Sequence, residues 1–209
     1  MVTRKISSAI TVASGSVIVA LVVLLTSSVA FGQADHVRWD IISVDVPPPL
    51  TVLNPDGEAF AFAYHTPGNP SEAKIRLTGA GTFVAPASGG PSGAVTGGGT
   101  WETSGSGLPE GSGTYRVTKL VSWVFAGFQT GTPTDNIGDV AERASGTAVF
   151  LIEYDDGSKG MLGVGCHGPG APNGIFEGVI ATKGYVTYWN GELPTPDADK
   201  DRTLFHLTK

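Results

Sequence analysis

Cys166 and His167 are the adjacent residues of this chain whose types best suit nucleophilic chemistry. A histidine within hydrogen-bond distance of a thiol can remove its proton and leave a thiolate, the nucleophilic form of cysteine. Neighbouring side chains of an extended strand point to opposite faces of a sheet, so within a strand these two cannot contact each other. An activated thiol would therefore require His36, His65 or His206 to approach through the fold. We keep Cys166 and His65 as catalytic candidates, although a small buried thiol at a strand end explains Cys166 more simply.

Carboxylates supply the other candidate chemistry, because two of them held about 5 to 9.5 Å apart can act as a general acid and a general base. Asp155 and Asp156 precede a glycine and are explained by a turn. Glu153 suits the solvent-facing end of one strand, and Glu177 opens another. We keep Glu153 and Glu177 as candidate catalytic carboxylates and favour a structural interpretation of both.

The sequence predicts neither a metal site nor a cofactor. The four histidines and the one cysteine lack the short spacing that is typical of zinc ligands. Acidic residues alternate at Asp197, Asp199 and Asp201, as in the first half of a calcium-binding loop. The match then ends, because Arg202 stands where the loop needs glycine and Thr208 where it needs a bidentate glutamate. A solvated connection is the better interpretation of this segment.

Nine segments show the alternation of apolar and polar residues, or the short apolar runs, that are typical of strands. They cover residues 37–46, 59–64, 74–83, 94–103, 115–125, 148–154, 159–167, 177–189 and 203–207. The phrase Gly-Thr-aromatic recurs at 81–83, 99–101 and 113–115, and such a glycine lets a neighbouring strand bend or approach. Sustained helical periodicity is absent from the sequence beyond residue 32. We predict an all-β, antiparallel barrel of eight or nine strands, with a β-sandwich as the alternative.

The strongest hairpin pattern is Asp155-Asp156-Gly157-Ser158, which lies between two apolar runs. An Asp-Gly pair suits a two-residue type I′ turn, because that turn needs positive φ values at both central residues. The resulting register would place Thr147 opposite Cys166. It would also place Cys166 on the same face of its strand as Leu162 and Val164.

The N-terminal 32 residues have the pattern of a signal peptide. Arg4 and Lys5 precede an apolar run at 17–25, and small residues precede a cleavage site after Gly32. The alternative is an uncleaved membrane anchor, because apolar residues extend from position 9 to position 31. We predict a signal peptide over 1–32 and a single secreted or extracytoplasmic β domain over 33–209, without stable membrane insertion after cleavage.

The net negative charge of the chain limits the classes of molecule that it is expected to bind. The chain carries 13 basic and 19 acidic side chains, and loss of residues 1–32 would remove Arg4 and Lys5 and leave it more acidic. An acidic surface repels phosphate backbones and anionic headgroups. We therefore expect neither nucleic acid nor a membrane surface as the main partner.

Aromatic residues offer the remaining functional indication. Four tryptophans, five tyrosines and nine phenylalanines, mostly at alternating strand positions, can fill a core or line an apolar cavity. Since the sequence contains no compact catalytic set, our leading hypothesis is a non-enzymatic secreted barrel that binds a small apolar ligand or an extracellular partner. One alternative is a cyclase- or hydrolase-like enzyme with its site in the barrel mouth. Another is a structural cell-surface domain, and the oligomeric state stays open.

Four segments together resemble an uncharacterised group of secreted bacterial β-rich proteins that has no established activity. They are Arg38–Ile41, Thr82–Pro86, Gly97–Trp101 and Phe176–Tyr185, and the resemblance covers most of residues 33–209. It implies an exported β-rich domain and carries no catalytic residue over to this chain. In the glycine and aromatic style of its strands, the chain is also similar to the barrels of dirigent proteins and allene oxide cyclases, which implies a fold and no function.

Overall fold

The structure of the protein is a computed structural model that describes residues 34–45, 52–54, 59–67, 69, 71–86, 90–131, 134–190 and 201–208. These residues belong to one compact unit, Gln33–Lys209. The predicted signal peptide over 1–32 lies outside the described residues and stays a prediction. Across the described ranges, no helix is long and apolar enough to cross a membrane.

The described residues form twelve strands and one short 3-10 helix, so the prediction of an all-β protein is confirmed. The strands are β1 (Asp35–Asp45), β2 (Val52–Asn54), β3 (Ala61–Tyr64), β4 (Lys74–Leu77), β5 (Ala80–Ala85), β6 (Gly98–Ser104), β7 (Gly111–Phe128), β8 (Arg143–Tyr154), β9 (Lys159–Cys166), β10 (Gly178–Lys183), β11 (Val186–Asn190) and β12 (Arg202–Thr208). The 3-10 helix η1 covers Val140–Glu142 and precedes β8.

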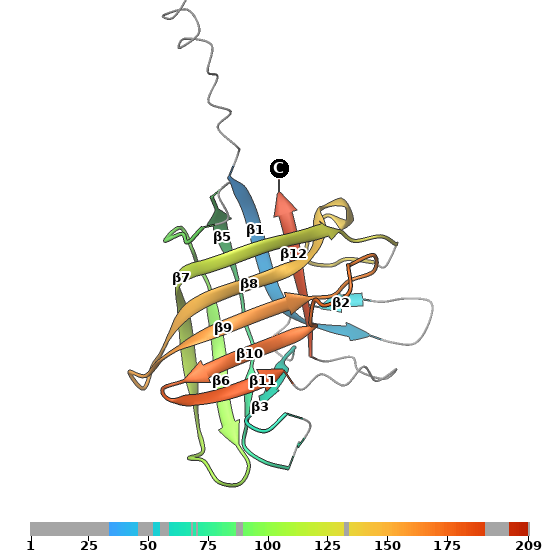
Figure 1. Cartoon of the computed structure of the whole chain (residues 1–209). Helices are drawn as coiled ribbons and strands as arrows, with labels where there is room; N and C mark the ends of the chain where they lie inside the picture. Colours follow the sequence, from blue (N-terminus) through green and yellow to red (C-terminus); the bar gives the residue numbers. More distant parts are fainter. Residues whose placement is uncertain are drawn as a thin grey trace, which may run out of the picture. The chain divides into compact units, whose positions relative to one another are not determined.

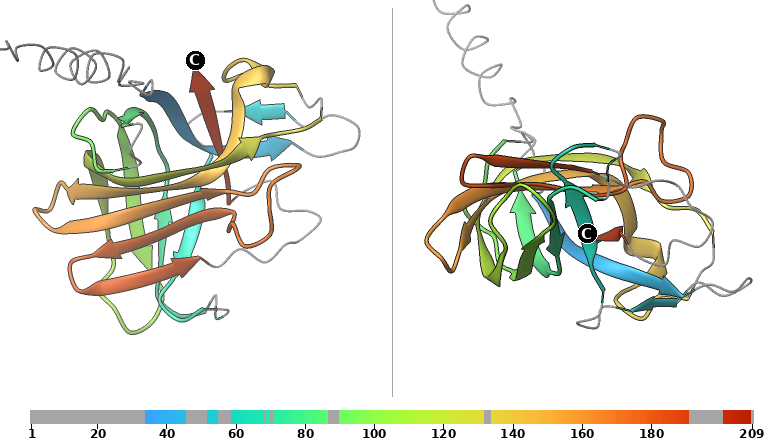
Figure 2. Two further views of the ribbon diagram at one scale, coloured as in Figure 1. Left: turned by 45° about the horizontal axis from the view of Figure 1, so that its top comes forward. Right: turned by 90° about the horizontal axis from the view of Figure 1, so that it is seen from below.

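All twelve strands belong to one antiparallel sheet with the order β12-β1-β5-β6-β4-β3-β11-β10-β9-β8-β7, and β2 pairs with β1. Because β12 also pairs with β8, and β6 with β7, the strands follow one another around a ring (Figure 1). Two further views show the strands around a common interior (Figure 2). The antiparallel arrangement is as predicted, and the ring is barrel-like or sandwich-like.

The predicted number of eight or nine strands was too low for three reasons. The segment 74–83 divides into β4 and β5 because the chain changes neighbours there: β4 pairs with β3, whereas β5 pairs with β1. The segment 177–189 divides into β10 and β11 at the tight turn Gly184-Tyr185. The short strand β2 was not predicted, and it pairs with the last residues of β1.

Aromatic rings fill the middle of the interior. Trp39, Phe83, Trp123, Phe150 and Phe205 come from five different strands and are all at most 6% exposed. The ring centroids of Trp123 and Phe205 lie 4.7 Å apart, and Phe83 lies 5.4 Å from Trp123 and 5.5 Å from Phe150. Edge-to-face contacts at these distances add to the large apolar area that each ring buries. At this level of the ring, the aromatic side chains form a packed core.

The β8–β9 hairpin turns where the sequence predicted, but its register differs by one residue. Gly146, not Thr147, lies opposite Cys166. The Tyr154 amide donates to the Ser158 carbonyl over 2.9 Å, so three residues form the loop instead of two. Gly157 closes this loop with φ of +85°, as in three-residue hairpins that end on a left-handed residue.

The predicted face of Cys166 is correct despite the change in register. Leu162, Val164 and Cys166 are each at most 1% exposed, whereas His167 is exposed. The one-residue difference in register does not change the face of Cys166, because side-chain alternation within β9 does not depend on the residue that lies opposite.

Replacing Gly157 by valine is expected to lower the free energy of unfolding by about 1 to 2 kcal/mol, because a β-branched residue resists positive φ. No atom lies within 4 Å of the position that a Cβ would take, so the whole cost comes from the backbone. Chemical denaturation measures the effect, and Gly157→Asn is the control because asparagine tolerates this conformation. An unchanged midpoint for Gly157→Val would contradict the assignment of the loop.

Candidate functional site

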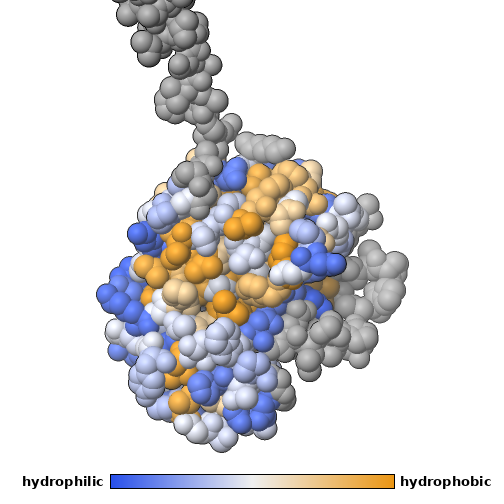
Figure 3. Space-filling view, viewed as in Figure 1, coloured by the Kyte–Doolittle hydropathy of each residue, from blue (hydrophilic) through white to orange (hydrophobic). Residues whose placement is uncertain are grey.

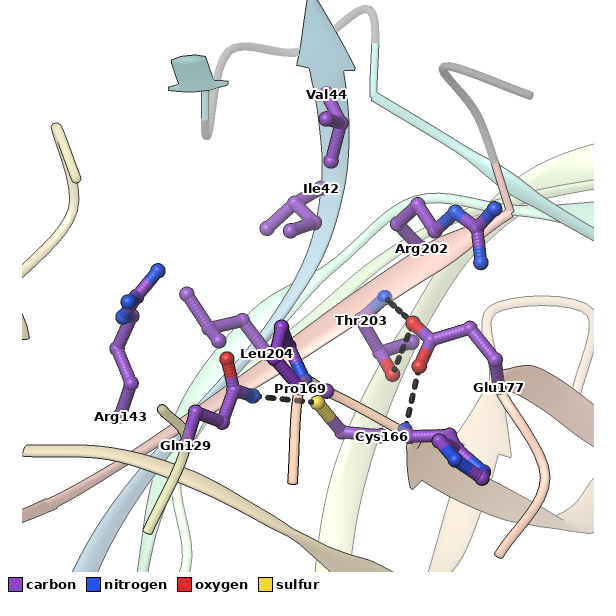
Figure 4. Close-up of a pocket in the computed structure, with 12 residues that line it drawn as sticks. Ile42, Val44, Gln129, Arg143, Cys166, Pro169, Glu177, Arg202, Thr203 and Leu204 are labelled. Carbon is purple, nitrogen blue, oxygen red and sulfur yellow. Dashed lines mark hydrogen bonds between the residues drawn. The ribbon is translucent and has the colours of Figure 1, made fainter. Parts of the chain in front are cut away.

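Two of the four predicted catalytic candidates, Cys166 and Glu177, meet at a pocket of about 220 Å³, which we call the polar pocket (Figure 4). It lies where β9 ends and β12 begins. Gln129, Arg143 and Thr203 also line it. This is the place in the described structure that most resembles the predicted catalytic site.

The thiol of Cys166 is not poised for nucleophilic attack. Cys166 is 1% exposed, and Gln129 donates a hydrogen bond from Nε2 to its sulfur over 3.2 Å. Burial raises the pKa of the Cys166 thiol well above its ordinary value, and the negative charge of Glu177 raises it further. The thiol is therefore protonated at neutral pH, and the simpler sequence interpretation of this cysteine agrees with the geometry.

The carboxylate of Glu177 holds strands together. It accepts a hydrogen bond from the His167 amide over 2.5 Å and another from the Thr203 amide over 2.7 Å (Figure 4). The Thr203 hydroxyl donates to the Gly165 carbonyl over 2.5 Å. Glu177 thus ties the end of β9 to the start of β12, and both of its oxygens are engaged with backbone amides.

His65 and Glu153 lie away from the polar pocket and are not among its lining residues. The exposed ring of His65 approaches the Thr187 carbonyl, with Nδ1 3.0 Å from the oxygen. Glu153 pairs with Arg116 and, over 3.5 Å, with Lys159 on the outside of the sheet. The fold therefore does not bring the four catalytic candidates into one constellation.

We expect the thiol of native Cys166 to react with 5,5′-dithiobis(2-nitrobenzoic acid) at least about 100-fold more slowly than in urea-unfolded protein, because it is buried and protonated. It is the one cysteine of the chain, so the signal needs no assignment. The measurement is the labelling rate of native and unfolded protein between pH 6 and 8. Rapid native labelling that persists below pH 7 would reveal an activated thiolate and restore the enzyme hypothesis.

A largely buried group of charges that sequence analysis missed lies where β1, β8 and β12 meet the segment before η1; we call it the ion cluster, and Arg38, whose side chain is 41% exposed, stands at its edge. Its members are Arg38, Asp40, Asp135, Arg143 and His206. His206 Nε2 lies 3.0 Å from Asp135 Oδ2, and Arg143 Nε lies 3.9 Å from the same oxygen. The side chains of Asp135, Arg143 and His206 are at most 3% exposed. Arg38 donates to both oxygens of Asp40 over 2.8 to 3.1 Å.

The environment shifts the pKa values of the two aspartates of the ion cluster in opposite directions. Burial raises the pKa of Asp40 above its ordinary value, although the hydrogen bonds from Arg38 oppose it. Burial would also raise the pKa of Asp135, but hydrogen bonds from the Ile137 amide and from His206 outweigh it and lower that pKa. Asp135 is therefore ionised at neutral pH, and its charge compensates the buried guanidinium of Arg143.

The ion cluster escaped prediction because Arg38 and Asp40 alternate with apolar residues and therefore look solvent-facing. Asp135 and Ile137, which lie between β7 and η1, cover this face instead, and Asp40 is 0% exposed. Nothing local in the sequence of β1 indicates a cover that comes from about a hundred residues away. The arrangement fixes the segment before η1 to the sheet, and Arg143 also lines the polar pocket.

Metal ligands do not gather in the described part of the chain: no three side chains of His, Cys, Asp or Glu there form a group that could hold an ion. Asp197 and Asp199 of the calcium-like segment lie outside the described residues. Asp201 is described, and its carboxylate accepts a hydrogen bond from the Phe62 amide over 2.5 Å.

An apolar pocket of about 230 Å³ opens on the outer face of β8 to β11, and we call it the outer pocket. Val149, Met161, Ile180 and Trp189 line it. Met161 is 43% exposed and Trp189 50%, which is high for large apolar side chains. Figure 3 shows apolar residues gathered over the same side of the molecule, around β7, β8 and β9. This surface has the chemistry to hold an apolar group.

The comparisons with known proteins leave the resemblance to secreted bacterial β-rich proteins as a prediction. No family model, no curated protein and no solved structure matches this chain.

Proposed function

We propose that this chain is an exported, non-enzymatic domain that binds a small apolar ligand in the outer pocket. Export rests on the signal-peptide pattern of residues 1–32. Binding rests on one observation, the solvent-open apolar pocket beside the exposed side chains of Met161 and Trp189.

The packing of β9 against β10 forms the base of the outer pocket. Val149, Gly163 and Ile180 are neighbours across β8, β9 and β10. Because Gly163 has no side chain, Ile180 lies against the bare backbone of β9, in the space that a Cβ at Gly163 would need. Met161 and Trp189, from β9 and β11, are left as partly exposed walls of the pocket.

Apolar contact is the interaction that this pocket can provide. Each square ångström of apolar surface that a ligand and the pocket remove from water contributes about 25 cal/mol to binding. Polar groups that would fix one orientation are few, since hydroxyl-bearing Thr182 and Thr187 are the main exceptions on the lining strands. A compact aromatic or branched aliphatic molecule therefore fits better than a polar one.

The alternatives have less support in the geometry. An enzyme in the ring mouth would need an activated group, whereas the Cys166 thiol is protonated and Glu177 is engaged with backbone amides. A purely structural domain gives no reason to leave Trp189 half exposed beside a hollow. A pocket of this size suits a small molecule, and a protein partner is one of the outcomes that the experiment below distinguishes.

We expect the neutral apolar dye N-phenyl-1-naphthylamine to bind saturably and to quench the emission of Trp189. The other tryptophans, Trp39, Trp101 and Trp123, are at most 6% exposed, so Trp189→Phe identifies the responding ring. Met161→Glu should weaken binding at least about tenfold, because it places a charge in the apolar lining. The measurement is a fluorescence titration of each variant.

Val124→Glu is the matched control, because Val124 is 62% exposed on β7 and does not line the outer pocket. It should bind the dye as the unaltered protein does. Equal loss in Val124→Glu and Met161→Glu would indicate adsorption to a general apolar surface. If the bound dye were released only when the protein self-associates at higher concentration, the occupant of the pocket would be another protein chain. Either of these two results would overturn the proposal.

A further inference from the structure

Three hairpin connections meet at one end of the ring and border a third pocket, of about 280 Å³, which we call the end pocket. They are the β6–β7 loop, the β8–β9 loop and the β10–β11 turn. Trp101, Tyr188, Lys183, Asp156, Glu110 and Tyr185 line it.

Buried aromatic rings underlie the end pocket. Trp101 and Tyr154 are at most 5% exposed, and their ring centroids lie 5.7 Å apart in an edge-to-face contact. The Trp101 indole donates to Asp155 Oδ1 over 3.0 Å, which fixes the ring in place. The pocket therefore rests on a rigid base and not on mobile side chains.

Lys183 is held above this base together with a carboxylate. Its ammonium lies 4.1 Å from the centroid of Trp101 and 5.0 Å from that of Tyr154, within range of cation–π attraction. It also pairs with Asp156 and lies 3.0 Å from the Ser158 hydroxyl. The hydrogen bond from Lys183, with further ones from Ser158, lowers the pKa of Asp156 to about 2. A positive donor and a negative acceptor are thus fixed side by side at neutral pH.

Tyr185 stands at the rim of the end pocket and is 92% exposed. It occupies the second position of the turn between Lys183 and Val186, which are paired across the hairpin. A ring this exposed contributes almost no burial to folding. The ring is therefore free to contact a ligand that enters the end pocket, which Tyr185 lines.

Tyr188 supplies an unused hydrogen-bonding group. Its side chain is buried, at 2% exposure, and lines the end pocket. In the part of the chain that the structure describes, its hydroxyl has neither donor nor acceptor partner. The hydroxyl is not among the fully buried side-chain atoms that lack a partner, so it is open to the pocket and can donate to or accept from a ligand hydroxyl.

We infer that the end pocket binds a neutral saccharide unit. The exposed ring of Tyr185 stacks on the C–H face of a pyranose, while Lys183, Asp156 and Tyr188 exchange hydrogen bonds with its hydroxyls. An anion is disfavoured, because the carboxylates of Asp156 and Glu110 outnumber the ammonium of Lys183 in this pocket. Tyr188 lines both this site and the outer pocket, but Lys183, Asp156, Glu110 and Tyr185 line only the end pocket, so the inference goes beyond the proposed function and does not depend on it.

The test is isothermal titration of the protein with four neutral oligosaccharides: cellohexaose, maltohexaose, laminarihexaose and chitohexaose. We expect saturable binding of at least one. Tyr185→Ala should weaken that binding at least about tenfold, whereas Tyr185→Phe, which keeps the ring, should stay within about threefold. Because Tyr185 is almost fully exposed, Tyr185→Ala should keep the unfolding midpoint of the unaltered protein.

Two further variants locate the site. Glu110→Gln should weaken binding, because Glu110 is an exposed acceptor of the end pocket. Trp189→Ala, which removes another exposed aromatic ring outside the end pocket, should leave saccharide binding unchanged. Absence of saturable binding by all four oligosaccharides overturns the inference, as does full affinity in Tyr185→Ala. Loss of affinity in Trp189→Ala alone would place saccharide binding at the outer pocket and equally overturn it.

Discussion

Replacement of Asp135 by alanine is expected to lower the free energy of unfolding by about 3 to 5 kcal/mol, because it leaves a buried guanidinium without its counter-charge. Arg143 is 1% exposed, and its Nε lies 3.9 Å from the Asp135 carboxylate. The same carboxylate accepts hydrogen bonds from the Ile137 and Gly138 amides over 2.8 and 3.1 Å. His206 would lose its partner as well.

Urea denaturation at neutral pH measures this loss, and Asp139→Ala is the matched control. Asp139 lies four residues further along the same segment and is exposed. Its carboxylate accepts from the Ala141 amide over 2.8 Å and caps η1, a contact whose removal typically costs about 1 kcal/mol. If Asp135→Ala cost no more than Asp139→Ala, the ion cluster would not stabilise the fold.

The same cluster sets a dependence of stability on pH. Because folding lowers the pKa of Asp135, its contribution is present above the unfolded value of 3.8 and is lost as the pH falls through the folded value. Asp40 acts in the opposite sense. Because folding raises its pKa, Asp40 contributes stability below pH 3.8, and this contribution is lost as the pH rises through the pKa of the folded state. The unaltered protein should lose stability below about pH 4, and Asp135→Asn should remove the part of that loss due to Asp135.

Replacing Gly99 by alanine is expected to lower the free energy of unfolding by about 3 kcal/mol, the upper range for overpacking. A Cβ there would overlap the Thr78 carbonyl oxygen and lie 2.7 Å from the Gly79 Cα. These neighbours are backbone atoms that cannot turn aside. The Thr78 and Thr100 hydroxyls, 2.7 Å apart, hold the two strands at this spacing.

Gly93→Ala is the control for Gly99→Ala, because no atom lies within 4 Å of a Cβ at Gly93 and its φ is not positive. It should change the free energy of unfolding by no more than about 0.5 kcal/mol. Near-equal midpoints for the two variants would mean that β6 and the β4–β5 segment are not packed as closely as the structure describes.

Most of the fold prediction was based on the alternation of apolar and polar side chains along each strand. Ile75, Leu77 and Phe83 are buried on one face, and Thr82 is exposed on the other, as the pattern indicates. Alternation reports which face is covered and says nothing about which strand lies beside it. For this reason the break near Gly79, where the partner changes from β3 to β1, had no local mark.

The candidate sites were predictable only in part, for a related reason. Cys166 and Glu177 were singled out by residue type, and the structure brings both to one pocket. Their roles depend on backbone amides and on Gln129, which residue types do not reveal. The outer and end pockets depend on packing between strands and on the meeting of three separate turns, and a single sequence contains no record of either.

The pairing of β12 with β1 has a consequence for the order of folding. Seven residue pairs join β12 to the first strand, and two more join it to β8. Until residues 202–208 have paired, β1 and the start of β8 each present an unpaired edge that can recruit other chains. Strands so distant in sequence also pair slowly. These two edges are therefore covered late in folding, and a chain exported in the unfolded state would cover them only after export.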